Sequence, residues 1–269
     1  MFDEINRKRC DHSVGKRYAS DLTDEEWKRI EHLFDSYQTV SVDLREMVNA
    51  CFYVDWTGCQ WRALPKDFGP WSTANGWKMK FQRTGLWRKI SLELLSEARV
   101  ALGRKAETTA GLIDSQSVKA SPQAGPRGTD GGKKVRGIKR HIVTCTAGLL
   151  VAVLCTAANV HDSKAAQTLL SRALSLPFSV LIADSAYVGP GVAEAAEAHG
   201  MSVRITVKDP TIKGFAPLPI RWRVEATFGA LTNFHRRLVR NWETSLESAE
   251  NAVWTANARR VLRAVTRKA

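Results

Sequence analysis

The sequence predicts an α/β protein in which a small all-α domain precedes a mixed sheet with flanking helices. Between residues 23 and 102, apolar residues recur every three or four positions, which is typical of amphipathic helices. From residue 111 onward, apolar runs of strand length alternate with helical stretches, which is typical of a mixed sheet. We therefore expect two domains, residues 1–105 and 106–269, which meet in the polar stretch 103–111.

The charge balance limits the kind of partner. The chain has 269 residues with 40 Lys and Arg against 27 Asp and Glu, a net charge of +13, and its pI is near 9.8. This excess fits a polyanionic partner, nucleic acid first and an anionic membrane second. No apolar run reaches the roughly 20 residues that span a bilayer, and the N-terminus does not resemble a signal peptide. We expect a protein that stays inside the cell and binds nucleic acid.

Helix-start signals organise the first domain. Residues 1–20 are polar and basic without periodicity, which indicates a loose arm. Thr23 with Glu26, and Asp43 with Glu46, have the spacing of a capping box in front of an apolar face. Helices are accordingly predicted at about 23–35, 43–58, 61–68, 72–84 and 87–102.

The helix predicted from Ser72 or Thr73 to about residue 84 interleaves aromatic and basic residues. Trp77 and Phe81 are four residues apart and are expected to pack inward. The arrangement of a helix, a short helix, a turn and a further helix resembles a helix-turn-helix domain. We therefore expect an outward, DNA-contacting face, although the same charges could merely solvate a surface; its basic residues are Lys78, Lys80 and Arg83.

The second domain shows five strand-like stretches. Residues 121–132 are rich in Gly and Pro and are expected to form a mobile loop. One predicted strand contains Asp114, and the other four lie at about 142–146, 149–154, 179–183 and 201–207. The predicted helices lie at about 162–176, 191–199, 222–240 and 246–267. Three strands, helix, strand, helix, strand, helix is the order of a ribonuclease-H-like domain.

Three carboxylates stand at comparable places in these elements. Asp114 ends a short apolar run, Asp184 ends a second one, and Glu225 lies on the first turns of a later helix. Each alone is best explained as a turn or helix-cap residue. In a ribonuclease-H-like order, however, these positions converge, so the three together predict one cluster at the rim of the sheet. Oxygen ligands of this kind suit hard divalent cations.

Sequence blocks along the chain carry a family resemblance. The blocks are Asp21–Trp27, Val42–Glu46, Thr57–Phe68, Pro70–Thr73, Asp114–Lys119, Gly131–Gly137, Lys139–His141, Ala158–Asp162, and Arg221–Phe228 followed by Arg236–Leu238. With these blocks in order, the sequence resembles bacterial insertion-sequence transposases of the DDE type over nearly its whole length.

The resemblance implies a function and a metal site. Asp114, Asp184 and Glu225 would bind two Mg²⁺ ions, for which Mn²⁺ can substitute, and the enzyme would cleave DNA and then transfer the strand. Its partners would be the terminal inverted repeats of the element and the target DNA, bound by a homo-oligomer, expected to be a dimer, in the bacterial cytoplasm at the nucleoid. Further phosphate contacts are expected from Lys139, Arg140, Arg221, Arg236 and Arg237.

Several positions depart from the family pattern. The segment 35–41 lacks the basic residues that relatives commonly have there. Cys145 stands where Asp is common and Ala186 where Gly is common, while Thr232 and Asn233 stand where a basic residue is usual. Two alternatives to a transposase therefore stay open: a metal-dependent nuclease that does not join strands, and a DNA-binding remnant without catalysis.

Nearby polar residues are expected to be structural. His141 and His161 are predicted to make structural hydrogen bonds rather than to transfer protons, and Asp162 is predicted to cap the helix that follows it.

Overall fold

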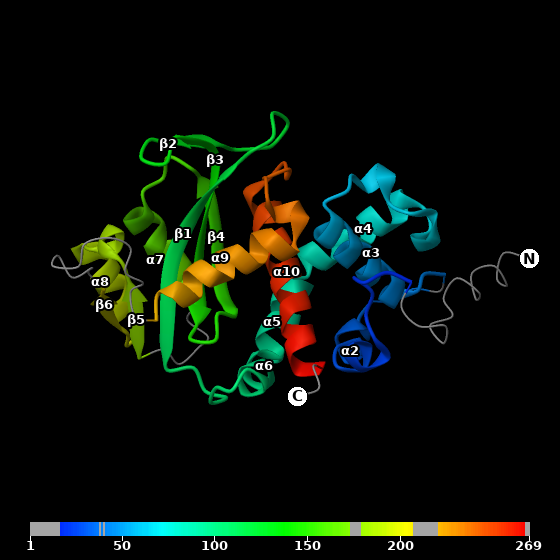
Figure 1. Cartoon of the computed structure of the whole chain (residues 1–269), viewed down its shortest axis with the longest axis horizontal. Helices are drawn as coiled ribbons and strands as arrows, with labels where there is room; N and C mark the ends of the chain where they lie inside the picture. Colours follow the sequence, from blue (N-terminus) through cyan, green and yellow to red (C-terminus); the bar gives the residue numbers. More distant parts are fainter. Residues whose placement is uncertain (1–16, 38, 40, 173–178, 207–219, 267–269) are drawn as a thin grey trace, which may run out of the picture.

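The computed structural model describes residues 17–37, 39, 41–172, 179–206 and 220–266. It contains a mixed sheet with helices on both faces and a helical region formed by the N-terminal part of the chain (Figure 1). This confirms the predicted fold class. Within the described ranges, no helix is both long and apolar enough to cross a membrane.

The N-terminal helices begin as the capping signals predict but end earlier. Thr23 accepts from the backbone N–H of Glu26, and Glu26 accepts from that of Thr23, so the capping box of α2 (Asp24–Lys28) is complete. The predicted helix to residue 35 breaks because Ile30, which is fully buried, leaves the helical backbone at φ −127°. A short 3₁₀ helix, η2 (Glu31–Phe34), follows.

The next helices pack around aromatic side chains, since the ring of Trp87 contacts those of Phe52 and Phe81. Helix α3 (Leu44–Thr57) is capped by Asp43, and α4 (Trp71–Arg83) begins directly after Pro70, without a cap from Ser72 or Thr73. The predicted helix 87–102 is divided at Leu94. The remaining helices of this region are η3 (Trp61–Ala63), η4 (Lys66–Phe68), α5 (Leu86–Glu93) and α6 (Leu95–Ala101).

All five predicted strands are present. The sheet order is β4–β3–β1–β5–β6, in which β1, β3 and β4 pair antiparallel while β1, β5 and β6 pair parallel. The strands are β1 (Ala110–Lys119), β2 (Gly128–Asp130), β3 (Val135–Cys145), β4 (Leu150–Ala157), β5 (Val180–Ala183) and β6 (Ser202–Ile205).

The segment predicted as a mobile loop is more ordered than its composition indicates. It contains β2, which pairs with the start of β3. Its earlier part is bound to a distant segment, since the N–H of Ser121 donates to the carbonyl of Asn241 (2.8 Å) and that of Gly125 to Glu243 (3.1 Å). Composition indicates where helices cannot form, but these long-range backbone bonds depend on the tertiary fold.

Helices cover the two faces of the sheet. Helix α7 (Asp162–Arg172) packs on β3 and β4, and α8 (Pro190–Glu197) packs on α7 and β6. Helix α9 (Trp222–Phe234) crosses in front of β1 in Figure 1. Two short helices, η5 (Ser185–Tyr187) and η6 (Arg236–Leu238), follow β5 and α9.

Helix α10 (Leu246–Thr266) joins the sheet to the N-terminal helices (Figure 1). Glu250 and Asn257 accept from backbone N–H groups of β4, at Cys155 (2.9 Å) and Leu150 (3.1 Å), so the helix covers this edge of the sheet. On its other side, α10 packs on α2, α3, α5 and α6. The predicted division at residue 105 stays a prediction, but the last helix contacts both parts.

Candidate active site

Two of the predicted metal ligands lie on adjacent parallel strands. Asp114 is within β1 and Asp184 directly follows β5, and these strands pair in register at Leu112 and Ile182. One oxygen of each carboxylate is bonded locally: Oδ1 of Asp114 accepts from the N–H of Ser115 (2.7 Å), and Oδ1 of Asp184 from that of Ala186 (2.9 Å). The Oδ2 atoms are left to face a common partner.

That partner is Arg221, which directly precedes α9. Its Nη2 atom lies 3.3 Å from Oδ2 of Asp114 and 3.2 Å from Oδ2 of Asp184. The side chain of Arg221 is only 8% exposed. A residue predicted to hold a DNA phosphate therefore lies between two residues predicted to hold a metal.

Burial dominates the ionisation of Asp114. It raises the pKa of this carboxyl to about 6, against the opposing effects of the Ser115 N–H and the Arg221 guanidinium, while Asp184 adds to the rise. A metal requires the ionised carboxylate. Cation binding at this carboxylate is therefore expected to strengthen as pH rises through about 6.

Glu225 lies apart from this pair. It is exposed on the first turn of α9, four residues after Arg221 and therefore on the same side of the helix. Among the residues that the structure describes, no group of three or more His, Cys, Asp or Glu is arranged to hold a metal ion. Asp114 and Asp184 are thus brought together and Glu225 is not.

The pair nevertheless fits a divalent cation. Both carboxylates direct an oxygen at a single positive nitrogen, and carboxylate oxygens are the ligands that Mg²⁺ and Mn²⁺ prefer. Asp114 and Asp184 could therefore hold such an ion where the guanidinium of Arg221 now lies. Ala186, one of the departures from the family pattern, leaves this arrangement intact because it contributes only its backbone N–H.

The predicted DNA-contacting helix presents one of its three cations outward. Trp77 and Phe81 pack inward as predicted. Lys78 points into the protein, where it donates to Oγ of Ser248 (2.9 Å) and lies 3.5 Å from Oε2 of Glu243. The two other cations differ: Lys80 lies over the rings of Trp77 (4.4 Å) and Tyr37 (5.5 Å), and Arg83 is exposed.

The two basic residues of β3 that were predicted to contact phosphates are interior. Lys139 lies 3.1 Å from Oδ1 of Asp162 and donates to the carbonyl of Val160 (2.9 Å). Arg140 is 2% exposed and donates to the carbonyl of Leu238 (2.8 Å). Successive residues of a strand covered on both faces are both buried, so neither side chain lies at the surface.

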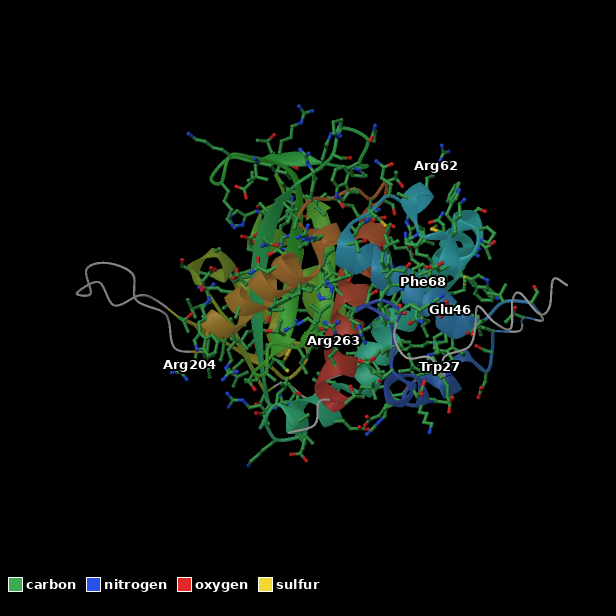
Figure 2. The ribbon with its side chains drawn as sticks, turned by 45° about the vertical axis from the view of Figure 1, so that its right-hand side comes forward. Trp27, Glu46, Arg62, Phe68, Arg204 and Arg263 are labelled. Carbon is green, nitrogen blue, oxygen red and sulfur yellow. The ribbon has the colours of Figure 1, made fainter. Side chains whose placement is uncertain are left out.

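The two arginines of η6 behave differently. Arg236 is exposed, whereas Arg237 donates two bonds to Oε1 of Glu243, at 3.0 and 2.7 Å. Exposed arginines also occur elsewhere: Figure 2 shows Arg62 and Arg204 at opposite sides of the molecule. The guanidinium of Arg62 lies over the ring of Trp71 (5.5 Å).

A polar group on the other face of β1 was not predicted. Asp162 is the first residue of α7, and its Oδ1 accepts from Oγ of Ser115 (2.9 Å), so it links helix to strand instead of acting as the predicted cap. The alternation of Asp114 and Ser115 along the strand was the available signal. Asp130 of β2 joins this group, because it accepts from Oγ of Ser117 and lies 3.9 Å from Nζ of Lys139.

Both histidines make the predicted structural bonds. His141 is fully buried and its Nε2 lies 2.9 Å from Oγ1 of Thr156, while Nδ1 of His161 lies 2.8 Å from Oγ of Ser163. Burial lowers the pKa of His141 to about 4, although Asp162 acts in the other direction.

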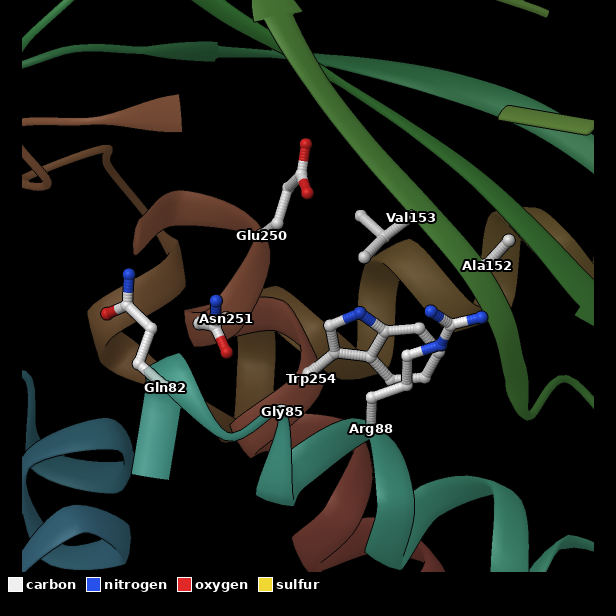
Figure 3. Close-up of a pocket in the computed structure, with 8 residues that line it drawn as sticks. All are labelled: Gln82, Gly85, Arg88, Ala152, Val153, Glu250, Asn251 and Trp254. Atoms are coloured by element: carbon white, nitrogen blue, oxygen red, sulfur yellow. The ribbon is translucent and has the colours of Figure 1, made fainter. Parts of the chain in front are cut away.

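A pocket of about 220 Å³ lies elsewhere, between β4, α10 and the start of α5 (Figure 3). Arg88, Glu250 and Trp254 are among the residues that line it. Neither Asp114 nor Asp184 does, so this pocket is separate from the carboxylate pair.

Comparison with known proteins finds two families that match different parts of the chain. The family described as "Transposase DDE domain" matches residues 105–258, more than half of the chain. A second family, with the description "Putative transposase of IS4/5 family", matches residues 22–91. None of the curated proteins compared with the chain matches it.

Proposed function

The chain belongs to the family of transposases with a DDE domain, and we propose that it binds the ends of its own insertion element, cleaves DNA there and transfers the freed strand to target DNA. The proposed metal ligands are Asp114, Asp184 and Glu225. Membership of this family supports a DNA-cleaving and DNA-transferring enzyme in general. The single observation that carries the proposal is that Asp114 and Asp184 direct oxygens at one shared cation.

Phosphodiester cleavage needs positive charge at the reacting phosphate, because negative oxygens repel an incoming nucleophile. Divalent ions bound here would neutralise that charge and lower the pKa of the attacking water or hydroxyl. The role of Asp114 and Asp184 is to hold these ions on a rigid sheet. Glu225 would join them through a rearrangement of the first turn of α9, which Arg221 directly precedes.

Cleavage and strand transfer use up no reagent other than water and the two DNAs. Water attacks phosphorus and the P–O3' bond breaks, so the element end leaves with a 3'-hydroxyl. In strand transfer, that hydroxyl attacks a phosphorus of the target, a new P–O bond forms and the target's own P–O3' bond breaks. A site with one carboxylate pair can serve both steps, since each is an in-line displacement at phosphorus.

DNA binding is proposed to use exposed cations on both parts of the chain. Arg83 on α4 and Arg236 on η6 are exposed, and Lys80 is half-buried on aromatic rings. We assign recognition of the element ends to α4, through Arg83 and Lys80. The protein would act as a homo-oligomer, proposed to be a dimer, at the nucleoid in the bacterial cytoplasm.

A strand-transfer assay tests the proposal. Purified protein is incubated with labelled duplex carrying the element ends, a target plasmid, and Mg²⁺, Mn²⁺ or EDTA. Joined products that require the metal and disappear with Asp184→Asn or Glu225→Gln would support it. Cleavage without joining would favour the nuclease alternative, and binding without cleavage would favour the remnant.

The recognition helix has a matched pair of variants. Arg83→Ala is expected to weaken binding to element ends by about 1 to 3 kcal/mol, more than to random DNA, if the side chain reads a base. Lys78→Ala should change DNA preference little and mainly loosen the contact with Ser248 and Glu243. Quantitative binding on both DNAs measures this, and equal losses for Arg83→Ala would reduce its role to a phosphate contact.

A further inference from the structure

We infer that Arg221 couples metal binding to DNA binding: its guanidinium holds the carboxylate pair until a DNA phosphate takes it, and its departure opens the pair to a divalent cation. The inference rests on the proposed function, since it takes Asp114 and Asp184 as metal ligands. It adds that DNA and metal each strengthen the binding of the other through this one side chain.

The first support is the form of the ion pairs. Arginine binds carboxylates most strongly through two parallel hydrogen bonds, with N–O distances of about 2.7 to 2.9 Å. Arg221 uses one nitrogen for both carboxylates at 3.2 and 3.3 Å. Its buried Nε has no hydrogen-bond partner within the described part of the chain. This guanidinium is therefore held loosely for a buried one.

A structural arginine in the same protein, Arg259, also has a buried Nε without a partner among the described residues, but it uses its two terminal nitrogens differently. Arg259 is 3% exposed, lies 2.6 Å from Oε1 of Glu26 through Nη1, and donates from Nη2 to the carbonyl of Asp21 (3.1 Å). Two of its nitrogens have separate acceptors, whereas one nitrogen of Arg221 is divided between two. The comparison indicates that Arg221 can leave its partners at lower cost.

The second support is the backbone beside Arg221. Ile220 has φ +70°, in the left-handed region that a β-branched residue rarely adopts and only at a cost in free energy. The first turn of α9 has no side-chain cap, and its bond from the N–H of Glu225 to the carbonyl of Arg221 is long, at 3.4 Å. Strain before the helix and a loose first turn both favour a rearrangement there.

Repulsion between the metal ion and Arg221 then couples metal binding to DNA binding. A divalent cation at Asp114 and Asp184 would repel the guanidinium, which stays protonated at any working pH. Once displaced, Arg221 needs another anion, and in DNA the phosphate adjoining the carboxylates supplies it. Glu225, one turn further along the helix, would move with Arg221. By thermodynamic linkage, DNA and metal must raise each other's affinity by the same factor.

Mn²⁺ affinity with and without DNA tests this coupling. Isothermal titration calorimetry measures the dissociation constant of Mn²⁺ for wild-type protein alone and with a saturating duplex. We expect the duplex to tighten Mn²⁺ binding about 10-fold, within the 5- to 150-fold usual for coupled sites. In Arg221→Gln, Mn²⁺ should bind more tightly without DNA, and the duplex should no longer change its affinity.

Two further variants separate charge from position. Arg223 lies two residues after Arg221, and its guanidinium lies over the ring of Trp222. Arg223→Gln removes the same charge as Arg221→Gln, but this variant should keep the 10-fold coupling. Arg221→Lys keeps one charged nitrogen, which is all that the carboxylate contacts use, and should retain most of the coupling. A coupling that survives in Arg221→Gln, or that Arg223→Gln also removes, would overturn the inference.

Asp114→Asn distinguishes this failure from failure of the proposed function. If Asp114→Asn abolishes Mn²⁺ binding while Arg221→Gln keeps the coupling, the metal site stands and only the role of Arg221 is wrong. If Asp114→Asn binds Mn²⁺ as wild type does, the metal site itself is wrong, and both the proposed function and this inference fall.

Discussion

Two similar ion clusters lie on the two faces of β1, and in each of them two aspartates share one basic side chain. The Arg221 cluster faces α9 and the Lys139 cluster faces α7. Their members are Asp114, Asp184 and Arg221 in the first, and Asp130, Asp162 and Lys139 in the second. Alternation along β1 directs Asp114 to one face, while Ser115 and Ser117, which donate to the aspartates of the second cluster, point to the other face.

The clusters differ in what supports them. In the Lys139 cluster, strand hydroxyls bind both carboxylates, Ser115 to Asp162 and Ser117 to Asp130, and the ammonium also donates to the carbonyl of Val160. In the Arg221 cluster, the carboxylates accept hydrogen bonds only from local backbone N–H groups, as far as the described residues show, beside their ion pairs with Arg221. A fully satisfied network is rigid, whereas carboxylates with oxygens held by a single long contact can exchange partners. The hydrogen bonds that hold the carboxylates, more than the residue types present, therefore distinguish a structural ion cluster from a functional one.

Substitution in the Arg221 cluster should produce the largest effect on activity. Asp114→Asn is expected to lower metal-dependent cleavage by about 10³-fold or more, because loss of a metal ligand removes several kcal/mol of transition-state stabilisation. The free energy of unfolding should fall little, since the ionised carboxylate is buried at a cost. Cleavage rates and urea unfolding on the same preparations measure both quantities, and near wild-type cleavage would contradict the assignment.

Substitution in the Lys139 cluster should instead lower stability and leave metal binding nearly unchanged. Asp162→Asn is expected to lower the free energy of unfolding by about 2 to 4 kcal/mol, because it leaves the buried ammonium of Lys139 without its closest carboxylate. Mn²⁺ affinity should stay within about twofold of wild type. If Asp162→Asn instead abolishes Mn²⁺ binding at unchanged stability, the division between the clusters is wrong.

His141, which lies beside the Lys139 cluster, should make the free energy of unfolding depend on pH. Burial lowers its folded-state pKa to about 4, below the ordinary value of about 6.5. The unfolded state therefore binds more protons between these values, and stability is lost as pH falls from about 6.5 to 4, by up to about 3 kcal/mol. Unfolding free energies of wild type and His141→Gln across this range test it: the decline should be shallower in the variant.

Asp114 of the Arg221 cluster should change the free energy of unfolding with pH in the opposite direction, and by a smaller amount. The folded-state pKa of Asp114 is raised to about 6, so the native state binds more protons between about pH 4 and 6. This group therefore favours folding at low pH, and its contribution falls by about 2 kcal/mol as pH rises through that window. In Asp114→Asn, stability should gain relative to wild type as pH rises from 4 to 6, and a constant difference would contradict the raised pKa.

Local sequence determined much of the fold. Thr23 with Glu26 started α2 as predicted, because capping involves residues a few positions apart. Apolar runs located the strands of Asp114 and the one before Asp184, because burial on both faces requires continuous apolar side chains. Two of the three carboxylates are neighbours for the same reason, since the ends of adjacent parallel strands meet.

The tertiary structure decided which cations lie inside. Nothing in the local pattern distinguishes Lys78 and Arg140, which are engaged internally, from Arg83 and Arg236, which are exposed. Exposure depends on which element packs over each side chain, and that is a property of segments distant in sequence.

The position of Glu225 shows the same limit at the site. The sequence by itself determined that α9 carries a carboxylate and an arginine four residues apart, on one side of the helix. Only the packing of α9 on β1 decided that Arg221, and not Glu225, lies against Asp114 and Asp184. Residues four apart lie on one side of a helix but about 6 Å apart along its axis. The position of the helix over the sheet therefore decides which of the two meets the carboxylates, and that position depends on contacts along the whole length of the helix.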